Sequence, residues 1–223
     1  MNRLGIRGPK PKGKVKIRWS ANFAYAIGLL VSDGCLSSGR HIILVSKDVE
    51  QLQNFMEALA IVVPIGKTKS GYDGNIAFKI QFSDVLFYNF LESIGLMPRK
   101  SKIIGEIKIP EKYFFDFLRG SFDGDGCTYS YWDPRWKSSF MFYTCFVSAS
   151  AKHISWLRDE IYKGLGIRGH MTGDGARIIF QLKYAKADSL KLLRKMYHSK
   201  KVLCLSRKRL KIIEMLATVR ERL

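Results

Sequence analysis

The order of apolar and polar residues predicts short helices and short strands that follow one another along the chain. Between Asp48 and Ala60 the apolar side chains fall on one side of a helix with 3.6 residues per turn. Those positions are Leu52, Phe55, Met56 and Leu59. Between Asn75 and Ser83 the apolar residues Ile76, Phe78, Ile80 and Phe82 alternate with smaller or polar ones. This alternation predicts a strand with one buried face and one polar, open face.

A more apolar helix is predicted ahead of these elements, between Ser20 and Gly34. Ser20 is a good N-cap residue, and Asp48 is expected to cap the helix of residues 48–60 in the same way. Gly34 is expected to take the left-handed conformation that ends many helices. Residues 35–46 predict a strand, a turn and a second strand with the sequence HIILV.

The chain contains an internal repeat. The segment AIGLLVSDGC at residues 26–35 recurs as LRGSFDGDGC at residues 118–127. The similarity continues in Val45-Ser46 and Val147-Ser148, each ahead of a helical pattern, and in Gln81 and Gln181. Extra residues in the second copy lie between 128 and 145, where a longer aromatic hairpin is predicted. Each half thus predicts the order helix, two strands, helix, two strands, helix, which is an α+β fold.

The repeat divides the chain into five parts. We expect a basic, flexible tail at residues 1–18, a first repeat at 19–96, a linker at 97–112, a second repeat at 113–204 and a C-terminal helix at 205–223. Pro98 and Pro110 are the helix stops in the linker region. The terminal helix is expected to bury Leu210, Ile213 and Leu216.

Composition favours a protein of the cell interior. Of the 223 residues 47% are hydrophobic, which is enough for one core or two small ones. The longest apolar run, Phe23 to Val31, is far shorter than the ~20 residues of a membrane span, and no signal-type segment opens the chain. The four cysteines stand apart, without the spacing of a zinc site. We expect an intracellular protein that resides with the genome, is not secreted, and holds no structural zinc.

The charge indicates a polyanionic partner. The chain has 38 Lys and Arg against 19 Asp and Glu, a formal net charge of +19. Residues 1–32 hold seven basic residues and no acidic one. Such an excess is destabilising unless a polyanion neutralises it, so nucleic acid is the leading partner. A basic ribosome-like protein and a membrane-surface protein are the alternatives that composition leaves open.

The repeated motif combines small residues with a terminal carboxylate. Gly28 and Gly120 interrupt their helices, where glycine costs about 1 kcal/mol relative to alanine, so a close approach of two helices is expected there. If the helices pack along these residues, Asp33 and Asp125 lie side by side at two helix C-termini, where negative charge is unfavourable. A divalent cation such as Mg²⁺, held by one or two carboxylates, water and phosphate, would offset the repulsion. The alternative is two ordinary Asp-Gly turns.

The stretches GLLVSDG and FLRGSFDGDG resemble the two motif copies of single-chain, intron-encoded LAGLIDADG homing endonucleases. The resemblance implies two pseudo-symmetric αββαββα repeats, a saddle of antiparallel sheets on the DNA and the motif helices at its centre. It implies Asp33 and Asp125 as catalytic metal ligands, joined by the carbonyl groups of Ser32 and Gly124. It further implies a monomer that cuts both strands of double-stranded DNA across the minor groove with Mg²⁺, or with Mn²⁺ in its place. Asp123 occupies a motif position at which the first copy has Val31, and is expected to be structural.

Basic residues near the scissile phosphates are also implied. The matching candidates are Lys100 and Lys201 as catalytic residues, with Lys47 as another; a solvated surface charge is the alternative for each. Cys35 and Cys127, which follow the two aspartates, are expected to be small buried strand residues.

Polar positions of the predicted strands are expected to contact DNA, because a two-stranded ribbon fits the major groove. In the first repeat they are Arg40, Lys47, Lys67, Lys69, Asn75, Lys79 and Gln81. In the second they are Tyr129, Tyr131, Trp132, Arg135, Lys137, Arg168, His170, Arg177, Gln181 and Lys183. Two other functions share this fold: an intron-splicing maturase that binds intron RNA without cleavage, and a transcription regulator, in which loss of the motif acids would be expected.

Overall fold

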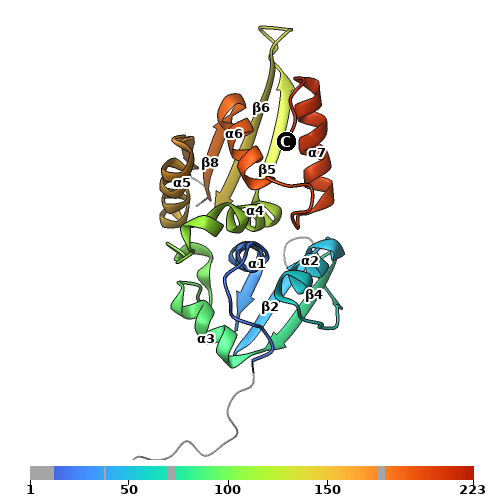
Figure 1. The fold of residues 1–223 in the computed structure, drawn as a ribbon, viewed down its shortest axis with the longest axis vertical. Coiled ribbons are helices and arrows are strands. Elements are labelled where there is room, and N and C mark those ends of the chain that lie inside the picture. The colour runs from blue at the N-terminus through green and yellow to red at the C-terminus, as the bar shows by residue number, and fades with distance from the viewer. Residues whose placement is uncertain (1–12, 38, 70–73, 175–178) are drawn as a thin grey trace, which may run out of the picture.

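A computed structural model describes residues 13–37, 39–69, 74–174 and 179–223 (Figure 1). The first half contains α1 (Ala21–Ser32), β1 (Gly34–Leu36), β2 (His41–Ser46), α2 (Val49–Leu59), β3 (Gly66–Lys69), β4 (Ile76–Ser83) and α3 (Val85–Ser93). The linker carries the short 3₁₀ turns η1 (Lys100–Lys102) and η2 (Glu111–Tyr113). The second half contains α4 (Phe114–Asp125), β5 (Cys127–Trp132), β6 (Phe140–Ser148), α5 (Ala151–Leu165), β7 (His170–Asp174), β8 (Ile179–Ala185) and α6 (Lys186–Met196), and α7 (Ser206–Thr218) follows.

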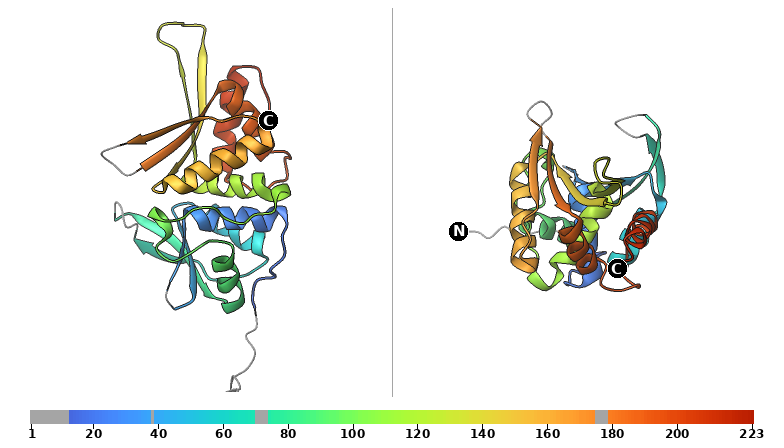
Figure 2. Two further views of the ribbon diagram at one scale, coloured as in Figure 1. Left: turned by 90° about the vertical axis from the view of Figure 1, so that its left-hand side faces the viewer. Right: turned by 90° about the horizontal axis from the view of Figure 1, so that it is seen from above.

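The two halves have the same topology, and the predicted α+β order αββαββα is confirmed. Each half forms one antiparallel sheet of four strands, in the order β1-β2-β4-β3 and β5-β6-β8-β7. The predicted long hairpin is formed by β5 and β6, which extend beyond the rest of the second half (Figure 2).

Register assigns each strand residue to one of two sheet faces, because residues directly opposite each other share a face. In the first sheet Ile42 pairs with Phe82 and Leu44 with Ile80, and all four are buried. The neighbouring pair, Ile43 with Gln81, lies on the opposite face, which is more exposed. The sheet is therefore covered on one face and open on the other, as the alternation predicts.

The alternation fails at the start of β4. Ile76, expected to be buried, is 67% exposed, whereas Ala77 is 2% exposed. Ile76 is the first residue of β4 and pairs with Lys69 at the end of β3, so it lies at the outer end of the sheet. Burial there follows the distance from the core rather than the strand period.

The helices α1 and α4 pack directly against each other between the two sheets (Figure 2). A Cβ atom on Gly28 would lie 2.7 Å from the backbone nitrogen of Ser121 and 2.9 Å from Cα of Gly120. A Cβ atom on Gly120 would lie 2.9 Å from the carbonyl carbon of Tyr25. Backbone meets backbone at this crossing, so glycine is required at both positions, and the C-terminal ends of the two helices come together.

The helix ends differ in part from the predictions. Ser20 Oγ accepts a hydrogen bond from the Phe23 amide over 3.1 Å, as an N-cap does. Gly34 does not take a left-handed conformation, because the strand β1 begins there and Asp33 is the C-cap. Glycine is needed there because a Cβ atom would lie 2.6 Å from Cα of Leu30. Asp48 makes no side-chain capping bond in α2.

Both terminal segments are placed differently from the expectation. Residues 13–18 belong to the predicted flexible tail, yet the Lys14 and Val15 amides donate to Asp84 Oδ2 over 2.5 and 2.9 Å. Residues 1–12 of that tail lie outside the described residues. In α7 the buried residues are Ile212, Met215 and Leu216.

The predicted face of α7 is wrong for two of its three residues. Leu210 is 58% exposed and Ile213 is 45% exposed. The reason is that α7 packs against β5 with the side of the helix that carries Ile212, Met215 and Leu216, so Leu210 and Ile213 turn to solvent. In the described part of the chain, no helix is both long and apolar enough to cross a membrane.

Candidate active site

The two motif aspartates meet where α1 and α4 end. Asp33 is the C-cap of α1, and Asp125 is the last residue of α4. A Cβ atom on Gly124 would lie 2.9 Å from Asp33 Oδ2, so the carboxylate of the first motif rests against the backbone of the second. The structure thus brings together the residues predicted as metal ligands.

Each aspartate lines its own pocket at the ends of α1 and α4. Asp33 and Gly124 line a pocket of about 310 Å³, together with Lys47, Gln51 and Arg207.

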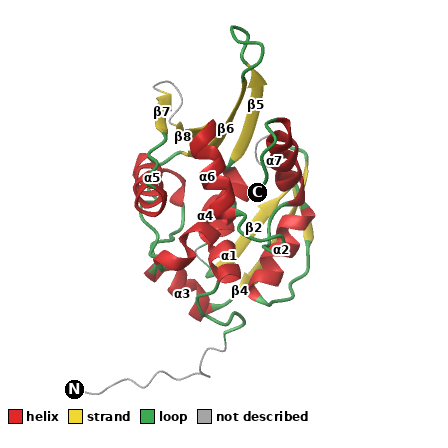
Figure 3. Ribbon diagram, turned by 45° about the horizontal axis from the view of Figure 1, so that its top comes forward, coloured by secondary structure: helices red, strands yellow, loops and turns green. Residues whose placement is uncertain are grey.

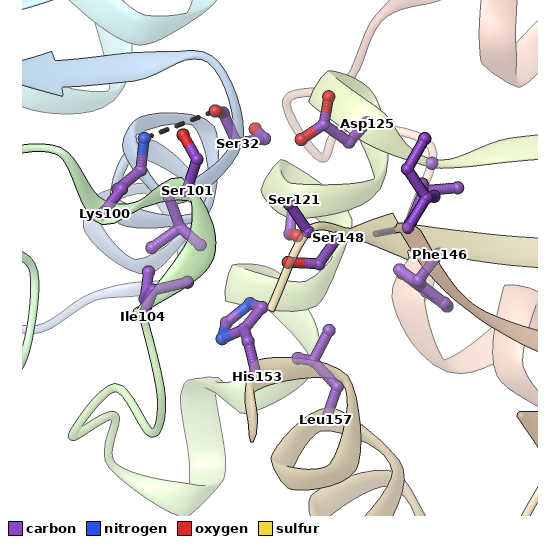
Figure 4. A pocket seen from close by; sticks show the side chains of 15 residues that line it. Ser32, Lys100, Ser101, Ile104, Ser121, Asp125, Phe146, Ser148, His153 and Leu157 are labelled. Carbon is purple, nitrogen blue, oxygen red and sulfur yellow. Dashed lines mark hydrogen bonds between the residues drawn. The ribbon is translucent and has the colours of Figure 1, made fainter. Parts of the chain in front are cut away.

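The second pocket, of about 210 Å³, has Asp125 and Ser32 in its wall. In both pockets, therefore, a carboxylate of one motif faces backbone of the other, as pseudo-twofold symmetry requires. Figure 4 shows Asp125 and Lys100 on opposite sides of this pocket.

The site is electrostatically unfavourable for its carboxylates. Burial, together with the charge of Asp125, raises the pKa of Asp33 from 3.8 to about 6. Burial also raises the pKa of Asp125. Both carboxylates end helices at the negative pole of the macrodipole, which adds to the cost of ionising them. A cation bound between them would remove this cost.

Lys100 reaches one end of the site from the linker. Its Nζ donates to the carbonyl oxygen of Ser32 over 3.5 Å and to that of Gly34. The side chain is buried, and burial lowers its pKa. Lys100, predicted as a catalytic residue, therefore lies at the ends of the motif helices, and its catalytic role stays a prediction.

The counterpart of Lys100 is Lys208 and not the predicted Lys201. Lys208 Nζ donates to the carbonyl oxygens of Phe122 (2.6 Å), Gly124 (3.0 Å) and Gly126 (2.7 Å), and burial lowers its pKa. Lys201 lies in an exposed turn after α6. The sequence carried a signal for the correct residue, because an Arg-Lys pair precedes Ser101 and another ends at Lys208.

Gln51 is a site residue that the sequence reasoning missed. Its Nε2 donates to Asp33 Oδ2 over 2.5 Å, and its Oε1 accepts from Ser46 Oγ over 2.9 Å. The repeat could have identified it, because Gln51 stands as far beyond Val45-Ser46 as His153 stands beyond Val147-Ser148.

His153 differs from Gln51 in its partner. Its Nδ1 lies 2.8 Å from the Gly105 carbonyl oxygen, and Nε2 is buried without a hydrogen-bond partner. The ring lines the Asp125 pocket (Figure 4). The two half-sites are therefore alike in their aspartates and lysines and unlike in this third side chain.

Asp123 is buried where α4 meets α1, as expected of a structural residue. It is 1% exposed, and its Oδ2 accepts from Tyr25 Oη (2.8 Å) and from the Leu205 amide (2.7 Å). Burial raises its pKa to about 6.

The donor set suits a hard divalent cation. Each pocket is lined by one motif aspartate and by either Ser32 or Gly124. A carboxylate group and a backbone carbonyl oxygen are therefore available as metal ligands in each. Mg²⁺ is commonly bound by one or two carboxylates together with water and substrate phosphates, so few protein ligands suffice. Among the described residues no group of three or more His, Cys, Asp or Glu residues could hold an ion without such help.

The open face of the first sheet presents only part of the predicted DNA contacts. Lys79 and Gln81 lie on it, opposite Val45 and Ile43. Lys67 and Lys69 pair with Phe78 and Ile76, so the register places both on the other face. The remaining predicted residues, Arg40, Lys47 and Asn75, are exposed in loops beside the strands.

The open face of the second sheet carries aromatic and polar side chains. Tyr129 and Tyr131 stack on Tyr143, with ring centroids 5.0 and 6.2 Å apart. Farther across the same face lie His170, Gln181 and Lys183, which the register places in line with Cys145 and Val147.

Other predicted contacts of the second repeat lie off this face. Trp132 packs against Phe140, Arg135 binds Asp133 over 3.1 Å, and Lys137 is exposed in the β5–β6 turn. Arg168 lies over the Tyr162 ring, and Arg177 lies outside the described residues.

Two cysteines differ from the expectation. Cys35 and Cys127, expected to be buried, are exposed. Register places Cys35 opposite Ile43 and Cys127 opposite Cys145, so both lie on the open sheet faces next to the motif aspartates.

Comparison with known proteins identifies the fold. No protein-family model and no curated protein matches the sequence. The meganuclease I-SmaMI bound to uncleavable DNA matches with a TM-score of 0.60 at 12% identity, over 90% of this chain and 92% of that chain. I-DmoI in complex with DNA and Ca matches with 0.56 at 14% identity, over 86% of this chain and 97% of that one.

A third match is full-length DUF199/WhiA from Thermatoga maritima, with a TM-score of 0.55 at 15% identity. The match covers 95% of this chain, which spans 65% of the length of that protein. The chain has the LAGLIDADG fold, as the resemblance of its two motifs predicts.

Proposed function

We propose that this chain is a divalent-metal-dependent, site-specific endonuclease that cuts both strands of double-stranded DNA. The observation that carries the proposal is the pair of pockets at the ends of α1 and α4, each with a motif aspartate and backbone of the other motif. Two equivalent sites suit a reaction performed twice, once on each strand. The I-SmaMI and I-DmoI structures with the same fold are DNA complexes, which supports DNA as the substrate class.

The side chains of the site have separable tasks in such a reaction. Asp33 and Asp125 would hold the cation, with the carbonyl oxygens of Ser32 and Gly124 beside them. The chemistry that a divalent cation supplies when bound is activation of water and stabilisation of the leaving oxygen. The ammonium groups of Lys100 and Lys208 lie at the same helix ends and would stabilise negative charge on the phosphates. Gln51 holds the Asp33 carboxylate in place through its amide.

The two open sheet faces would bind the flanking DNA. They present Lys79 and Gln81 in one half and His170, Gln181 and Lys183 in the other. A two-stranded part of each sheet would fit a major groove, where such side chains read base edges. Cleavage would then occur between the sheets, across the minor groove that faces the helix ends.

The test uses a plasmid library of random duplex inserts with the purified protein and Mg²⁺. We expect linear products from a small subset of inserts, no product with EDTA, and no product with Asp33→Asn or Asp125→Asn. Asp159→Asn, which removes an exposed carboxylate of α5, is the matched control and should cut like the unaltered protein. Cutting by the double variant Asp33→Asn/Asp125→Asn would refute the proposed function. Binding to structured RNA with no cleavage of any duplex would instead support a maturase.

A further inference from the structure

The five residues before Lys208 are fixed one by one. We refer to residues Leu203–Arg207 as the connector. Its partners, in order, are Arg119 Nε to the Leu203 carbonyl (2.9 Å), Asn54 Nδ2 to the Cys204 carbonyl (2.9 Å), the Leu205 amide to Asp123 Oδ2 (2.7 Å), the Ser206 amide to Glu50 Oε1 and Oε2 (3.1 Å each), and Arg207 to Asp48 Oδ2 (2.8 Å). Successive residues bonded in this way leave the connector little freedom.

The partners come from both repeats. Asp48, Glu50 and Asn54 lie at or in α2 of the first repeat, whereas Arg119 and Asp123 belong to α4 of the second. Figure 3 shows α7 beginning beside α2. The connector therefore joins the two halves at the point where the chain delivers Lys208 to the helix ends.

Burying Asp123 is costly, and the fold does not demand it. The equivalent position of the first motif is Val31 in α1, which is also buried, at 7% exposed. An apolar side chain therefore fits this position of the motif. A buried carboxylate is unfavourable unless its hydrogen bonds compensate, and Asp123 uses one oxygen to hold Tyr25 and the connector. The hydrogen bond to the connector therefore gives a reason for a carboxylate at position 123.

Asp48 and Glu50 act from the surface. Both carboxylates face the first turn of α7, where the positive pole of the helix attracts negative charge. The Asp48–Arg207 pair is exposed to solvent, so it adds orientation more than stability.

We propose that Asp48, Glu50 and Asp123 are positioning residues that set Lys208 against the end of α4. Lys208 is the first residue after the connector, and its ammonium group contacts three carbonyl oxygens at the end of α4, among them those of Gly124 and Gly126 on either side of Asp125. Lys100 serves the other helix end from the linker and does not depend on the connector. The proposal rests on the proposed function and adds that loss of the connector bonds disables one of the two half-sites.

Two measurements test the proposal on the full chain. The first is hydrogen exchange at the Leu205 and Ser206 amides, which donate directly to Asp123 and Glu50. The second is strand-resolved cleavage of a duplex that the unaltered protein cuts, with each strand labelled separately. The surface variant is Asp48→Ala/Glu50→Ala, which removes the acceptor oxygens, and Glu57→Ala on the exposed side of α2 is its matched control.

In the surface variant we expect the Ser206 amide hydrogen to exchange with solvent about tenfold faster. We also expect the variant to cut one of the two strands about tenfold more slowly, so that nicked DNA accumulates. Asp123→Val should act in the same way at Leu205. Asp123→Asn should restore both readouts toward those of the unaltered protein, because one amide oxygen can accept both bonds. The strand that slows should be the one that slows in Lys208→Ala.

The outcomes separate the two proposals. If the unaltered protein cuts neither strand of any duplex, the proposed function fails and the positioning role fails with it. If it cuts both strands, and the variants exchange faster but still cut both strands at equal rates, only the positioning role is refuted. Equal slowing of the two strands, or unchanged exchange at Leu205 and Ser206, would also refute it.

Discussion

The substitution Asp33→Asn should stabilise the metal-free protein. The pKa of Asp33 is raised from 3.8 to about 6 by burial and by Asp125. A shift of this size corresponds to about 3 kcal/mol of folding free energy lost when the group is ionised. The asparagine side chain would keep an oxygen for the Gln51 amide but carry no charge. At about 2–4 °C per kcal/mol, the melting temperature should rise by roughly 6–12 °C.

The effect has a defined pH window. Because the pKa of Asp33 is higher in the folded state, the folded state binds more protons between pH 3.8 and about 6. The stability of the unaltered protein is therefore lost as pH rises through that window, and the loss is complete above it. The advantage of Asp33→Asn should be absent below pH 3.8 and full at pH 7.

Thermal melts in EDTA at several pH values measure this difference. Asp159→Asn again serves as the control for removing an exposed carboxylate. Adding Mg²⁺ should raise the melting temperature of the unaltered protein more than that of Asp33→Asn, because a bound cation offsets the same repulsion. A variant that melts well below the unaltered protein at pH 7 would show that Asp33 is a structural cap, and the reasoning about its cost would be wrong.

Four other predictions follow from the packing and the charges. Gly28→Ala should destabilise by about 1–3 kcal/mol or more in urea denaturation, whereas Gly105→Ala, whose added Cβ meets nothing within 4 Å, should stay within about 0.5 kcal/mol. Burial lowers the pKa of His153 from 6.5 to about 4, so between these pH values the unfolded chain is protonated at His153 and the folded protein is not. The unaltered protein should therefore lose stability as pH falls from 6.5 to about 4, and His153→Gln should lose less over that range in acid melts. Lys208→Ala should slow cleavage by about a hundredfold in single-turnover assays, while Lys201→Ala should leave it unchanged. DNA affinity should fall by about a thousandfold or more between ~50 and ~200 mM salt if six phosphates are neutralised, and a flat response would contradict a role of the +19 charge in DNA binding.

The topology could be predicted from the sequence because the same pattern of helices and strands occurs in both repeats. The repeat set the element order, and Gly28 and Gly120 indicated which helices approach closely. The alternation of apolar and polar residues predicted the buried face correctly in the middle of β4, as at Ile80, where β4 lies between β2 and β3. At Ile76 the pattern failed because position in the sheet, which no local window contains, decides burial there.

The two aspartates of the site could be predicted from the sequence, but Gln51 and Lys208, which contact the helix ends from other elements, were missed. Asp33 and Asp125 follow from the motif alone. The sequence held signals for Gln51 and Lys208, but only the structure shows that both reach the helix ends. Lys208 does so because the connector contacts α2 before the first turn of α7 returns to the end of α4. Lys201 looked equivalent to Lys100 because both follow a helix of their repeat. Lys201, however, comes before the connector, and the chain reaches the helix ends only after the connector, at Lys208.

The fold by itself does not decide the activity, since both a meganuclease and the N-terminal LAGLIDADG domain of DUF199/WhiA match this chain at low sequence identity. The cost of the site does bear on the activity. Two carboxylates lie at the negative ends of two packed helices, and the pKa of one is raised to about 6 by burial and by the other. A chain that needed only the saddle and its basic faces would be more stable with asparagine at either position. Perturbed carboxylates of this kind are typical of groups whose charge is required in a reaction. The charge that destabilises the folded protein therefore adds, within the described residues, to the support that the pair of pockets gives to the proposed function.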